Sequence, residues 1–128
     1  MRATFLVERD LEVPMRDGIV LRADVYRANV AQRSPVLLQR TPYGKGESQI
    51  PMALMAVERG YSVVIQDTRG RWASGGENYP LIHEREDGYD TLEWVANQTW
   101  CNGLIGMYGS SYLGYTQWAA AAAGHPAL

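Results

Sequence analysis

The sequence is poor in the residues that build disulfides and metal sites. It contains one cysteine, Cys101, and two histidines, His83 and His125, among 128 residues. A single cysteine excludes a disulfide within the chain, and without cysteine or histidine neighbours it excludes a thiolate metal site. A chain of this length can still bury a sizeable core. We therefore expect a fold held by that core, with no metal and no cofactor.

Long apolar runs and blocks of one charge are also missing. No run approaches the roughly 20 apolar residues of a membrane span. The net charge of −2 comes without the basic stretch that nucleic-acid binding requires. The opening residues MRATFLVERD lack the apolar centre of a signal peptide. We therefore expect a cytoplasmic protein that binds neither nucleic acid nor a membrane.

The first part of the chain alternates apolar and polar residues. Residues 4–14 and 18–26 both follow this pattern, and Asp17-Gly18 between them is a strong turn signal. The pattern predicts an antiparallel hairpin, a pair of edge strands that starts a sheet. Residues 27–34 are polar and irregular, which predicts a surface connection.

From residue 35 onward, short apolar runs alternate with segments of helical spacing. The apolar runs are residues 36–38, 63–65 and 104–105, and the helical segments include residues 50–59, residues 89–96 and an alanine-rich helix that ends at Ala123. This alternation predicts an α/β fold, with a mostly parallel sheet, right-handed crossovers and helices on both faces. Functional groups of such sheets collect at the carboxyl ends of the strands.

Three segments follow the predicted buried strands and are expected to meet at one edge of the sheet. They are residues 40–46, 67–76 and 109–114. Their convergence favours a functional site more strongly than any one of them does.

The charged residues of the first two segments are assigned structural roles. We expect Asp67, Arg69 and Arg71 to pair with one another and hold a long glycine-rich loop, with substrate contact as the alternative. Lys45 is expected to be solvated. Trp72 lies in a loop near the predicted cleft, so it is a candidate for contact with an acyl group.

A strand-like run and an alanine-rich helix meet around Ser111 with almost no loop between them. A serine on such a sharp turn suits nucleophilic acyl transfer, because its hydroxyl is exposed and the next amide faces the oxyanion position. Ser111 is preferred to Ser110 because Gly109 and Gly114 then occupy the crowded positions around it. A plain Gly/Ser turn without chemistry is the alternative at this point.

Five segments together resemble one known family. In order they are RTPYGKG, QDTRGRWASGGE, EREDGYDTLEWVANQTWCNGLIGMYG, GSSYLG and YTQW. The joint pattern is similar to the X-Pro dipeptidyl-peptidase family of serine hydrolases, which also holds cocaine esterase-like (CocE/NonD) enzymes, cephalosporin acylase-type enzymes and α-amino acid ester hydrolases. The resemblance covers nearly the whole chain from Leu11 onward.

The resemblance implies an α/β-hydrolase fold and a role for three residues. Ser111 would be the nucleophile, Tyr112 would offer its backbone N–H to the oxyanion, and Tyr43 would offer its phenolic O–H. A phenol is protonated at neutral pH and can donate to an alkoxide. A surface aromatic is the alternative for Tyr43. The substrate would be a small-molecule ester or amide, or a peptide.

The resemblance also sets the expected domain organisation. Residues 1–128 would be the N-terminal portion of an α/β-hydrolase catalytic domain with a truncated sheet. Residues 1–33 would form the hairpin and connection, and residues 34–128 the β-α-β units with the nucleophile elbow at 109–114. The full-length protein is compatible with an oligomer.

A serine nucleophile needs a base and an acid, and neither is evident. In α/β-hydrolases both follow the serine along the chain. The 17 residues after Ser111 contain no acidic residue, and His125 between Gly124 and Pro126 is interpreted as a helix stop. We expect the acid and base beyond residue 128, and an isolated chain that is inactive and prone to association. The alternative is a non-catalytic α/β binding module that keeps the elbow for packing.

Overall fold

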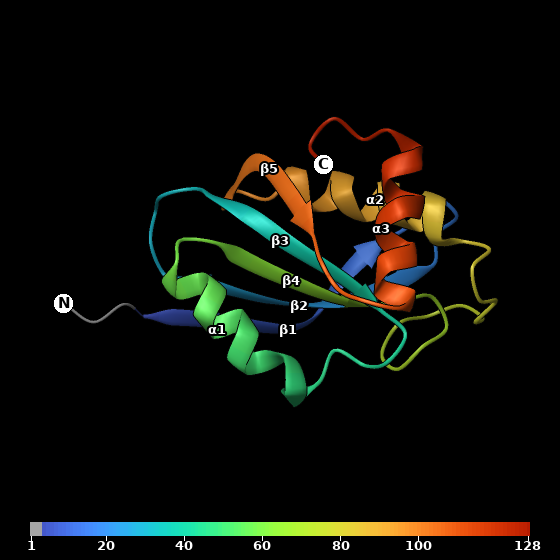
Figure 1. The fold of residues 1–128 in the computed structure, drawn as a ribbon, viewed down its shortest axis with the longest axis horizontal. Helices are drawn as coiled ribbons and strands as arrows, with labels where there is room; N and C mark the ends of the chain where they lie inside the picture. The colour runs from blue at the N-terminus through green and yellow to red at the C-terminus, as the bar shows by residue number, and fades with distance from the viewer. Residues whose placement is uncertain (1–3) are drawn as a thin grey trace.

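A five-stranded mixed sheet forms the centre of the computed structural model, which describes residues 4–128 (Figure 1). Its strands are β1 (Phe5–Pro14), β2 (Val20–Ala28), β3 (Ser34–Thr41), β4 (Ser62–Asp67) and β5 (Cys101–Met107). They lie in the order β1-β2-β4-β3-β5. The β1–β2 and β2–β4 pairs are antiparallel, whereas β3 runs parallel to both β4 and β5. The predicted α/β class is therefore confirmed.

Helices cover both faces of this sheet, as predicted. Helix α1 (Ile50–Glu58) follows a short 3-10 turn, η1 (Glu47–Gln49), and packs on one face. Helices α2 (Glu84–Ala96) and α3 (Tyr112–Ala123) pack on the other face and against each other (Figure 1). In the described part of the chain, no helix has the length and apolar character needed to cross a membrane.

The N-terminal hairpin forms where the sequence predicts it, with one correction. Its turn closes between Met15 and Ile19, and Gly18 supplies the positive φ of 85° that the turn requires. Of the two hairpin strands, only β1 lies at an edge of the sheet, because β2 also pairs with β4. A bulge interrupts β1 at Asp10, whose φ is 55°, and this irregularity has no signal in the alternating pattern.

Two apolar cores lie on opposite faces of the sheet. The core under α2 and α3 includes the fully buried side chains of Val36, Leu38, Val64, Leu92 and Val95. The core under α1 includes Tyr26, Ala53, Val57, Val63 and Ile65. All six residues of β4 are buried, because this strand has neighbours on both sides and helices over both faces. That arrangement explains its continuous apolar run.

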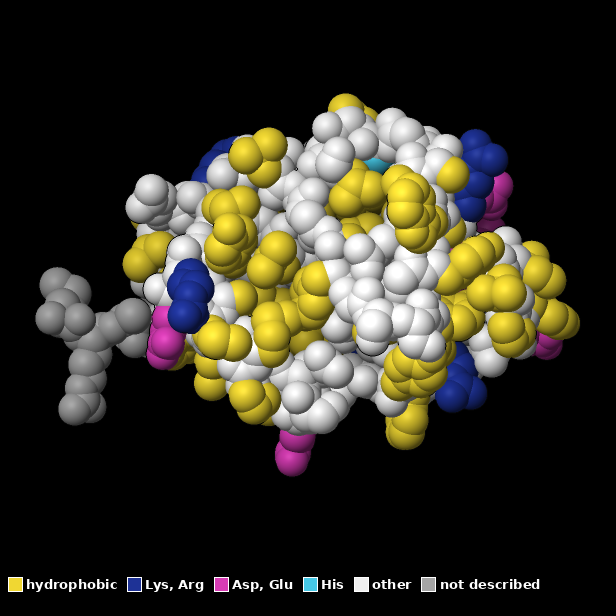
Figure 2. Space-filling model, in the orientation of Figure 1, with side chains coloured by type: hydrophobic (Ala, Val, Ile, Leu, Met, Phe, Trp, Pro, Cys, Tyr) yellow, Lys and Arg dark blue, Asp and Glu magenta, His cyan; other side chains and the backbone are white. Residues whose placement is uncertain are grey.

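Hydrophobic side chains also gather on the surface near β5 and α3 (Figure 2). Leu104 is 64% exposed and Trp118 is 79% exposed, and Met107 and Leu128 line a hollow beside Trp118. Among the described strands, β5 pairs only with β3. An uncovered apolar patch beside an unpaired strand edge favours contact with other protein. The expected association of the isolated chain stays a prediction.

Candidate active site

Ser111 occupies a strained turn between a strand and a helix. Strand β5 ends at Met107, and α3 begins at Tyr112, directly after Ser111. The backbone of Ser111 has φ 59° and ψ −127°. A non-glycine residue held in such a conformation costs about 1 to 3 kcal/mol, and such strain clusters at functional sites. The side chain of Ser111 is exposed, so the turn presents its hydroxyl to solvent.

The two glycines around Ser111 differ in how much they matter. Gly109 has φ 124°, and a Cβ there would lie 2.5 Å from the Cβ of Leu113. Position 109 therefore requires glycine, as predicted. A Cβ at Gly114 would meet nothing closer than the carbonyl oxygen of Gly109, at 3.9 Å. The prediction that Gly114 occupies a crowded position is therefore wrong, because a Cβ there would make only an ordinary van der Waals contact.

Tyr43 faces Ser111 from the loop that follows β3. Its phenolic oxygen lies 3.3 Å from the Oγ of Ser111. The backbone N–H of Tyr43 donates to the Oγ1 of Thr41 at 3.0 Å, which fixes the start of the loop. The side chain of Tyr43 is 58% exposed, so it is a surface aromatic that also contacts Ser111. The structure thus brings the two predicted site residues together.

The second loop holds the first loop in place. The Nε of Arg71 and the Nε1 of Trp72 both donate to the carbonyl oxygen of Pro42, each at 3.1 Å. The ring of Trp72 also lies close to Gly44, where a Cβ would come within 3.1 Å of it. Gly44 has φ 99°, a backbone conformation that favours glycine. These contacts fix the backbone on both sides of Tyr43.

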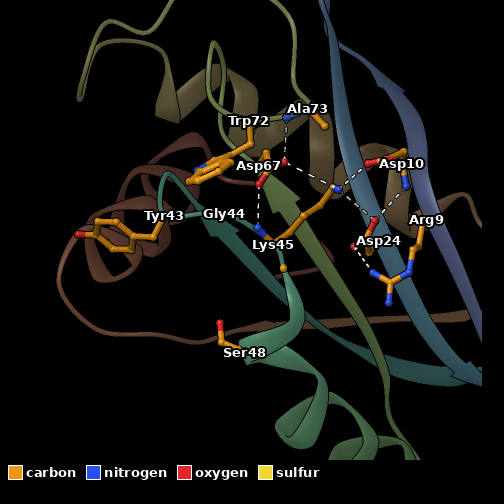
Figure 3. Close-up of a pocket in the computed structure, with 11 residues that line it drawn as sticks. Arg9, Asp10, Asp24, Tyr43, Gly44, Lys45, Ser48, Asp67, Trp72 and Ala73 are labelled. Carbon is orange, nitrogen blue, oxygen red and sulfur yellow. Dashed lines mark hydrogen bonds and ion pairs between the residues drawn. The ribbon is translucent and has the colours of Figure 1, made fainter.

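Lys45 is buried among three carboxylates rather than solvated as predicted (Figure 3). Its Nζ lies 2.5 Å from Asp10, 3.2 Å from Asp24 and 3.8 Å from Asp67, and its side chain is 11% exposed. Burial alone would lower the pKa of Lys45, but its hydrogen bonds to Asp10 and Asp24 raise it. Asp67 also accepts the N–H groups of Lys45 and Ala73. Burial raises the pKa of Asp67.

A pocket of about 560 Å³ opens beside Tyr43 (Figure 3). Its walls include Tyr43, Trp72 and the carboxylates around Lys45. Trp72 is 71% exposed, so its ring is accessible to a ligand from this side. Tyr43 both lines the pocket and contacts Ser111. Tyr43 therefore connects the pocket to the turn at Ser111, although Ser111 itself is not among the lining residues.

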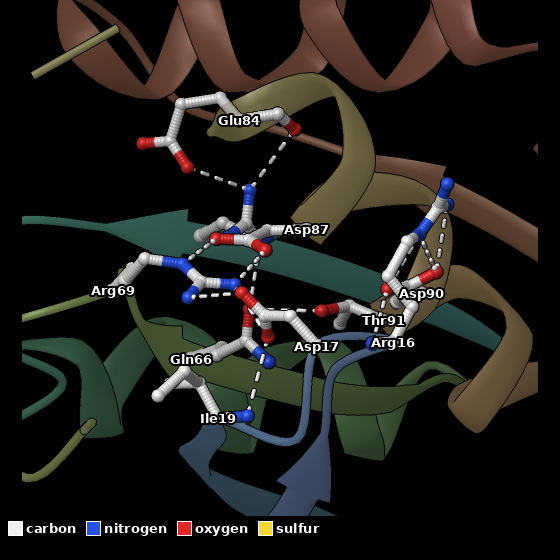
Figure 4. A network of polar contacts seen from close by, with 10 residues as sticks. Arg16, Asp17, Ile19, Gln66, Arg69, Glu84, Asp87, Asp90 and Thr91 are labelled. Carbon is white, nitrogen blue, oxygen red and sulfur yellow. Dashed lines mark hydrogen bonds and ion pairs between the residues drawn. The ribbon is translucent and has the colours of Figure 1, made fainter. Parts of the chain in front are cut away.

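Arg69 binds two carboxylates outside its own loop (Figure 4). Its Nη2 lies 2.7 Å from Asp87 in α2, and its Nη1 lies 2.8 Å from Asp17 in the hairpin turn. The hydrogen bonds to Asp87 raise the pKa of Arg69 despite its burial. The predicted pairing of Asp67, Arg69 and Arg71 with one another is therefore wrong. Arg69 instead joins its loop to α2 and to the hairpin.

Glu84 belongs to a buried polar network whose pairing the sequence did not predict (Figure 4). Arg40 is fully buried, and its Nη1 lies 3.0 Å from the Oε1 of Glu84. The other carboxylate oxygen of Glu84 accepts the O–H of Tyr112 at 2.7 Å. Burial raises the pKa of Tyr112 to about 12, and the bond to Glu84 adds to this. The one available signal is Arg40, a charged residue that ends a predicted buried strand.

The backbone N–H of Tyr112 lies in the first turn of α3, next to Ser111. Backbone N–H groups in a first helical turn have no acceptor within the helix, so they can bind an anion. Ser111 therefore has a phenolic O–H on one side and a backbone N–H adjacent to it in sequence. This arrangement can supply a nucleophile and two donors for an oxyanion. Within residues 4–128, no group of three His, Cys, Asp or Glu side chains could hold a metal ion.

Neither histidine of the described chain hydrogen-bonds to Ser111. The Nε2 of His125 lies 3.0 Å from the Oε2 of Glu93, and its Nδ1 accepts the N–H of Ala127. His125 follows Gly124, which ends α3 with φ 77°, so its predicted place at a helix stop is confirmed. His83 directly precedes α2. The described residues thus supply no histidine base to Ser111.

The fold is that of the α/β-hydrolases. An α-amino acid ester hydrolase matches with a TM-score of 0.84 and 31% identity, over 97% of this chain and 24% of its own. A CocE/NonD family hydrolase from Staphylococcus aureus matches with a TM-score of 0.88 and 34% identity, over 97% of this chain and 26% of its own. An acetyl xylan esterase from Thermoanaerobacterium, at 18% identity and a TM-score of 0.77, shares the fold alone.

The chain belongs to the X-Pro dipeptidyl-peptidase (S15) family, which it matches over residues 17–128. It is 47% identical over 125 residues to the cocaine esterase of Rhodococcus sp. strain MB1 Bresler. It is 29% identical, over an alignment of 140 positions that covers 91% of this chain, to a putative serine esterase of Mycobacterium bovis. The chain spans 22% of the length of each of these relatives. The resemblance stated from the motifs is confirmed, and the relatives are hydrolases.

Proposed function

We propose that the chain carries the nucleophile and the oxyanion hole of a serine acyl hydrolase. The observation that carries the proposal is the 3.3 Å contact between Tyr43 and Ser111, with Ser111 exposed in a strained turn. A serine used only for packing needs neither a positive φ nor a facing phenol. Strain of this kind is retained where the surrounding structure holds a reactive group in place.

The proposed reaction proceeds through an acyl-enzyme. The Oγ of Ser111 attacks the carbonyl carbon of an ester or amide, and its proton passes to a base. The resulting oxyanion accepts hydrogen bonds from the N–H of Tyr112 and the O–H of Tyr43. The alcohol or amine then leaves with a proton, and water releases the acid by the reverse sequence of steps. The base and its orienting acid are assigned to residues that follow residue 128.

The substrate class follows from the relatives and from the pocket. Two relatives carry the names cocaine esterase and α-amino acid ester hydrolase, which favours a small-molecule ester or amide, with a peptide as a further candidate. The pocket beside Tyr43 would hold part of this substrate against Trp72. The proposal includes a cytoplasmic location and a substrate in solution, not nucleic acid or a membrane.

One observation favours a different function. Neither histidine in residues 4–128 hydrogen-bonds to Ser111. A non-catalytic binding module would need no such bond, because it needs no base. Such a module would keep the turn at Ser111 only for packing. A fluorophosphonate probe distinguishes the two functions, because it reacts with an activated serine and not with an inert one.

The test compares Ser111→Ala with Ser110→Ala in the full-length gene product that contains this chain. We expect turnover of a p-nitrophenyl ester to fall at least about 10⁴-fold in Ser111→Ala. Ser110→Ala should keep its activity, because it removes a neighbouring exposed hydroxyl that the mechanism does not use. Full turnover in Ser111→Ala would contradict the proposal. Absence of both turnover and probe labelling in the unmodified protein would favour the binding module.

A further inference from the structure

We propose that Glu84 is a positioning residue that sets the geometry of the oxyanion hole. The inference rests on the proposed function, because it concerns the two donors assigned there. Glu84 is the first residue of α2 and is 4% exposed. Its carboxylate contacts one residue on each side of the proposed hole, so it can fix one donor relative to the other.

The two contacts of Glu84 reach the two segments that carry the donors. Its Oε1 lies 3.0 Å from the Nη1 of Arg40, which is the second-last residue of β3, three residues before Tyr43. Its Oε2 accepts the O–H of Tyr112 at 2.7 Å. Tyr112 supplies the backbone N–H next to Ser111. One carboxylate therefore links the loop of the phenolic donor to the turn of the backbone donor.

The phenol of Tyr112 is held from two directions. It donates to Glu84 and accepts the backbone N–H of Leu81 at 3.0 Å. A second contact comes from the next turn of α3, where the Oγ1 of Thr116 lies 3.2 Å from the carbonyl oxygen of Arg40 and shares its single O–H with the closer carbonyl oxygen of Leu113, at 2.8 Å. The start of α3 therefore has few ways to shift relative to β3 while these bonds are intact.

Burial makes the link through Glu84 stiff. The side chains of Arg40 and Glu84 are 0% and 5% exposed, so water does not compete with their contact. Charge-assisted hydrogen bonds in such surroundings are short and strong. A donor displaced by about 1 Å can lower a rate about 100-fold. Loss of the link should therefore lower the rate of the chemical step more than it weakens substrate binding.

The decisive variant is Tyr112→Phe in the full-length active protein. It removes the O–H that reaches Glu84 but keeps the backbone N–H and the buried pair of Arg40 and Glu84. We expect kcat to fall about tenfold, with KM changed less than twofold. A trifluoromethyl ketone, which forms a tetrahedral adduct with the serine, should bind more weakly by a similar factor.

Tyr115→Phe is the matched control. Tyr115 lies one turn further along α3, and its O–H donates to the carbonyl oxygen of Leu81 at 2.8 Å. It lies on the same helix and contacts the same loop as Tyr112, but it has no bond to Glu84. We expect kcat to be unchanged in this variant.

Glu84→Gln provides the second variant and a double-mutant cycle. It should lower kcat at least as much as Tyr112→Phe, and adding Tyr112→Phe should then cause a smaller loss than it causes alone, because Glu84→Gln already removes the charge that strengthens the Tyr112–Glu84 bond. If Glu84→Gln does not fold, because it leaves Arg40 without its charge partner, Tyr112→Phe alone decides the question. If Tyr112→Phe does not fold, Glu84→Gln tests the proposal instead. The expected result is again a lower kcat with a KM that changes less than twofold.

Three results would overturn the role of Glu84. They are an unchanged kcat in Tyr112→Phe, equal losses in Tyr112→Phe and Tyr115→Phe, and additive losses in the cycle. Activity in Ser111→Ala would instead refute the proposed function, so the two failures are distinguishable.

Discussion

The hydroxyl oxygens of Tyr43 and Ser111 lie 3.3 Å apart, although 68 positions separate the two residues in the sequence. The loop that carries Tyr43 follows β3, and the turn that carries Ser111 follows β5. These strands are parallel neighbours in the sheet, so their carboxyl ends meet at one edge. The order of the strands therefore creates the contact on which the proposed chemistry depends.

Replacing Tyr43 by Phe should lower kcat of the full-length protein about 10²- to 10³-fold, because one of two oxyanion donors is lost. KM should change little, since the donor acts mainly on the tetrahedral intermediate. Steady-state kinetics with a p-nitrophenyl ester measure both constants. Tyr61→Phe is the control, because Tyr61 is an exposed tyrosine at the opposite end of the sheet, just before β4. An unchanged kcat in Tyr43→Phe would remove Tyr43 from the oxyanion hole.

Gly109→Ala should destabilise the fold, whereas Gly114→Ala should not. A Cβ at position 109 would clash with Leu113 at 2.5 Å and would sit at φ 124°. We expect the free energy of unfolding to fall by about 2 to 4 kcal/mol. Gly114 lies inside α3 with free space, so alanine there should stabilise the helix by up to about 1 kcal/mol. Urea denaturation measures both, and equal losses would contradict the geometry of the turn.

Two arginine variants compare a buried ion pair with an exposed one (Figure 4). Arg69→Met should cost about 3 to 5 kcal/mol, because Asp87 would remain buried and unpaired. Arg16→Met should cost much less, since its pair with Asp90 is partly exposed to solvent. Denaturant unfolding of the two variants, which remove the same charge, measures the difference. Similar losses of stability in the two variants would contradict the burial of the Arg69–Asp87 pair.

Lys45→Met should make stability depend more strongly on pH. Lys45 is paired with Asp10 and Asp24 and lies near Asp67, and its hydrogen bond lowers the pKa of Asp10 below the ordinary 3.8. Without the lysine, Asp10 loses the hydrogen bond that lowers its pKa, and the pKa of Asp67, which burial already raises, rises further in the folded state. The folded variant then binds more protons than the unfolded chain, so its stability falls as the pH rises above about 4.

The expected loss in Lys45→Met is about 2 to 3 kcal/mol at neutral pH, below the range for a fully buried pair because Asp10 is partly exposed. The loss should shrink below about pH 4, where the carboxylates become protonated in both states. Unfolding midpoints of the unmodified protein and of Lys45→Met, measured between pH 3 and pH 8, would show whether their stabilities converge at low pH. Lys45→Arg keeps the cation and serves as the control. A loss that is equal at every pH would contradict the electrostatic account.

The fold could be predicted from the sequence because its signals are local. Alternation around Asp17-Gly18 defines the hairpin, and apolar runs separated by helical spacing define the parallel strands. The turn at Ser111 was predictable because β5 and α3 leave almost no residues between them. The place of β2 between β1 and β4 could not be predicted, since strand pairing depends on the complete sheet.

The polar network was the part that sequence reasoning missed. Lys45 and Arg69 carry charges that usually lie in solvent, and the partners that bury them come from β2, α2 and the hairpin turn. The role of Glu84 was missed for a related reason. An acidic residue at the start of α2 is already explained by the helix N-terminus, so the sequence gives no reason to expect a buried pair there. Such pairings join segments distant in the sequence, so only the arrangement of the chain in space can show them.

The most direct test of the central claim is intact and peptide mass spectrometry of the full-length protein after rapid quenching with an ester substrate or a fluorophosphonate. If Ser111 is the nucleophile, one covalent adduct forms, located on the peptide that contains Ser111 and absent from Ser111→Ala. An adduct on another residue, or continued turnover with no adduct at Ser111, would contradict it.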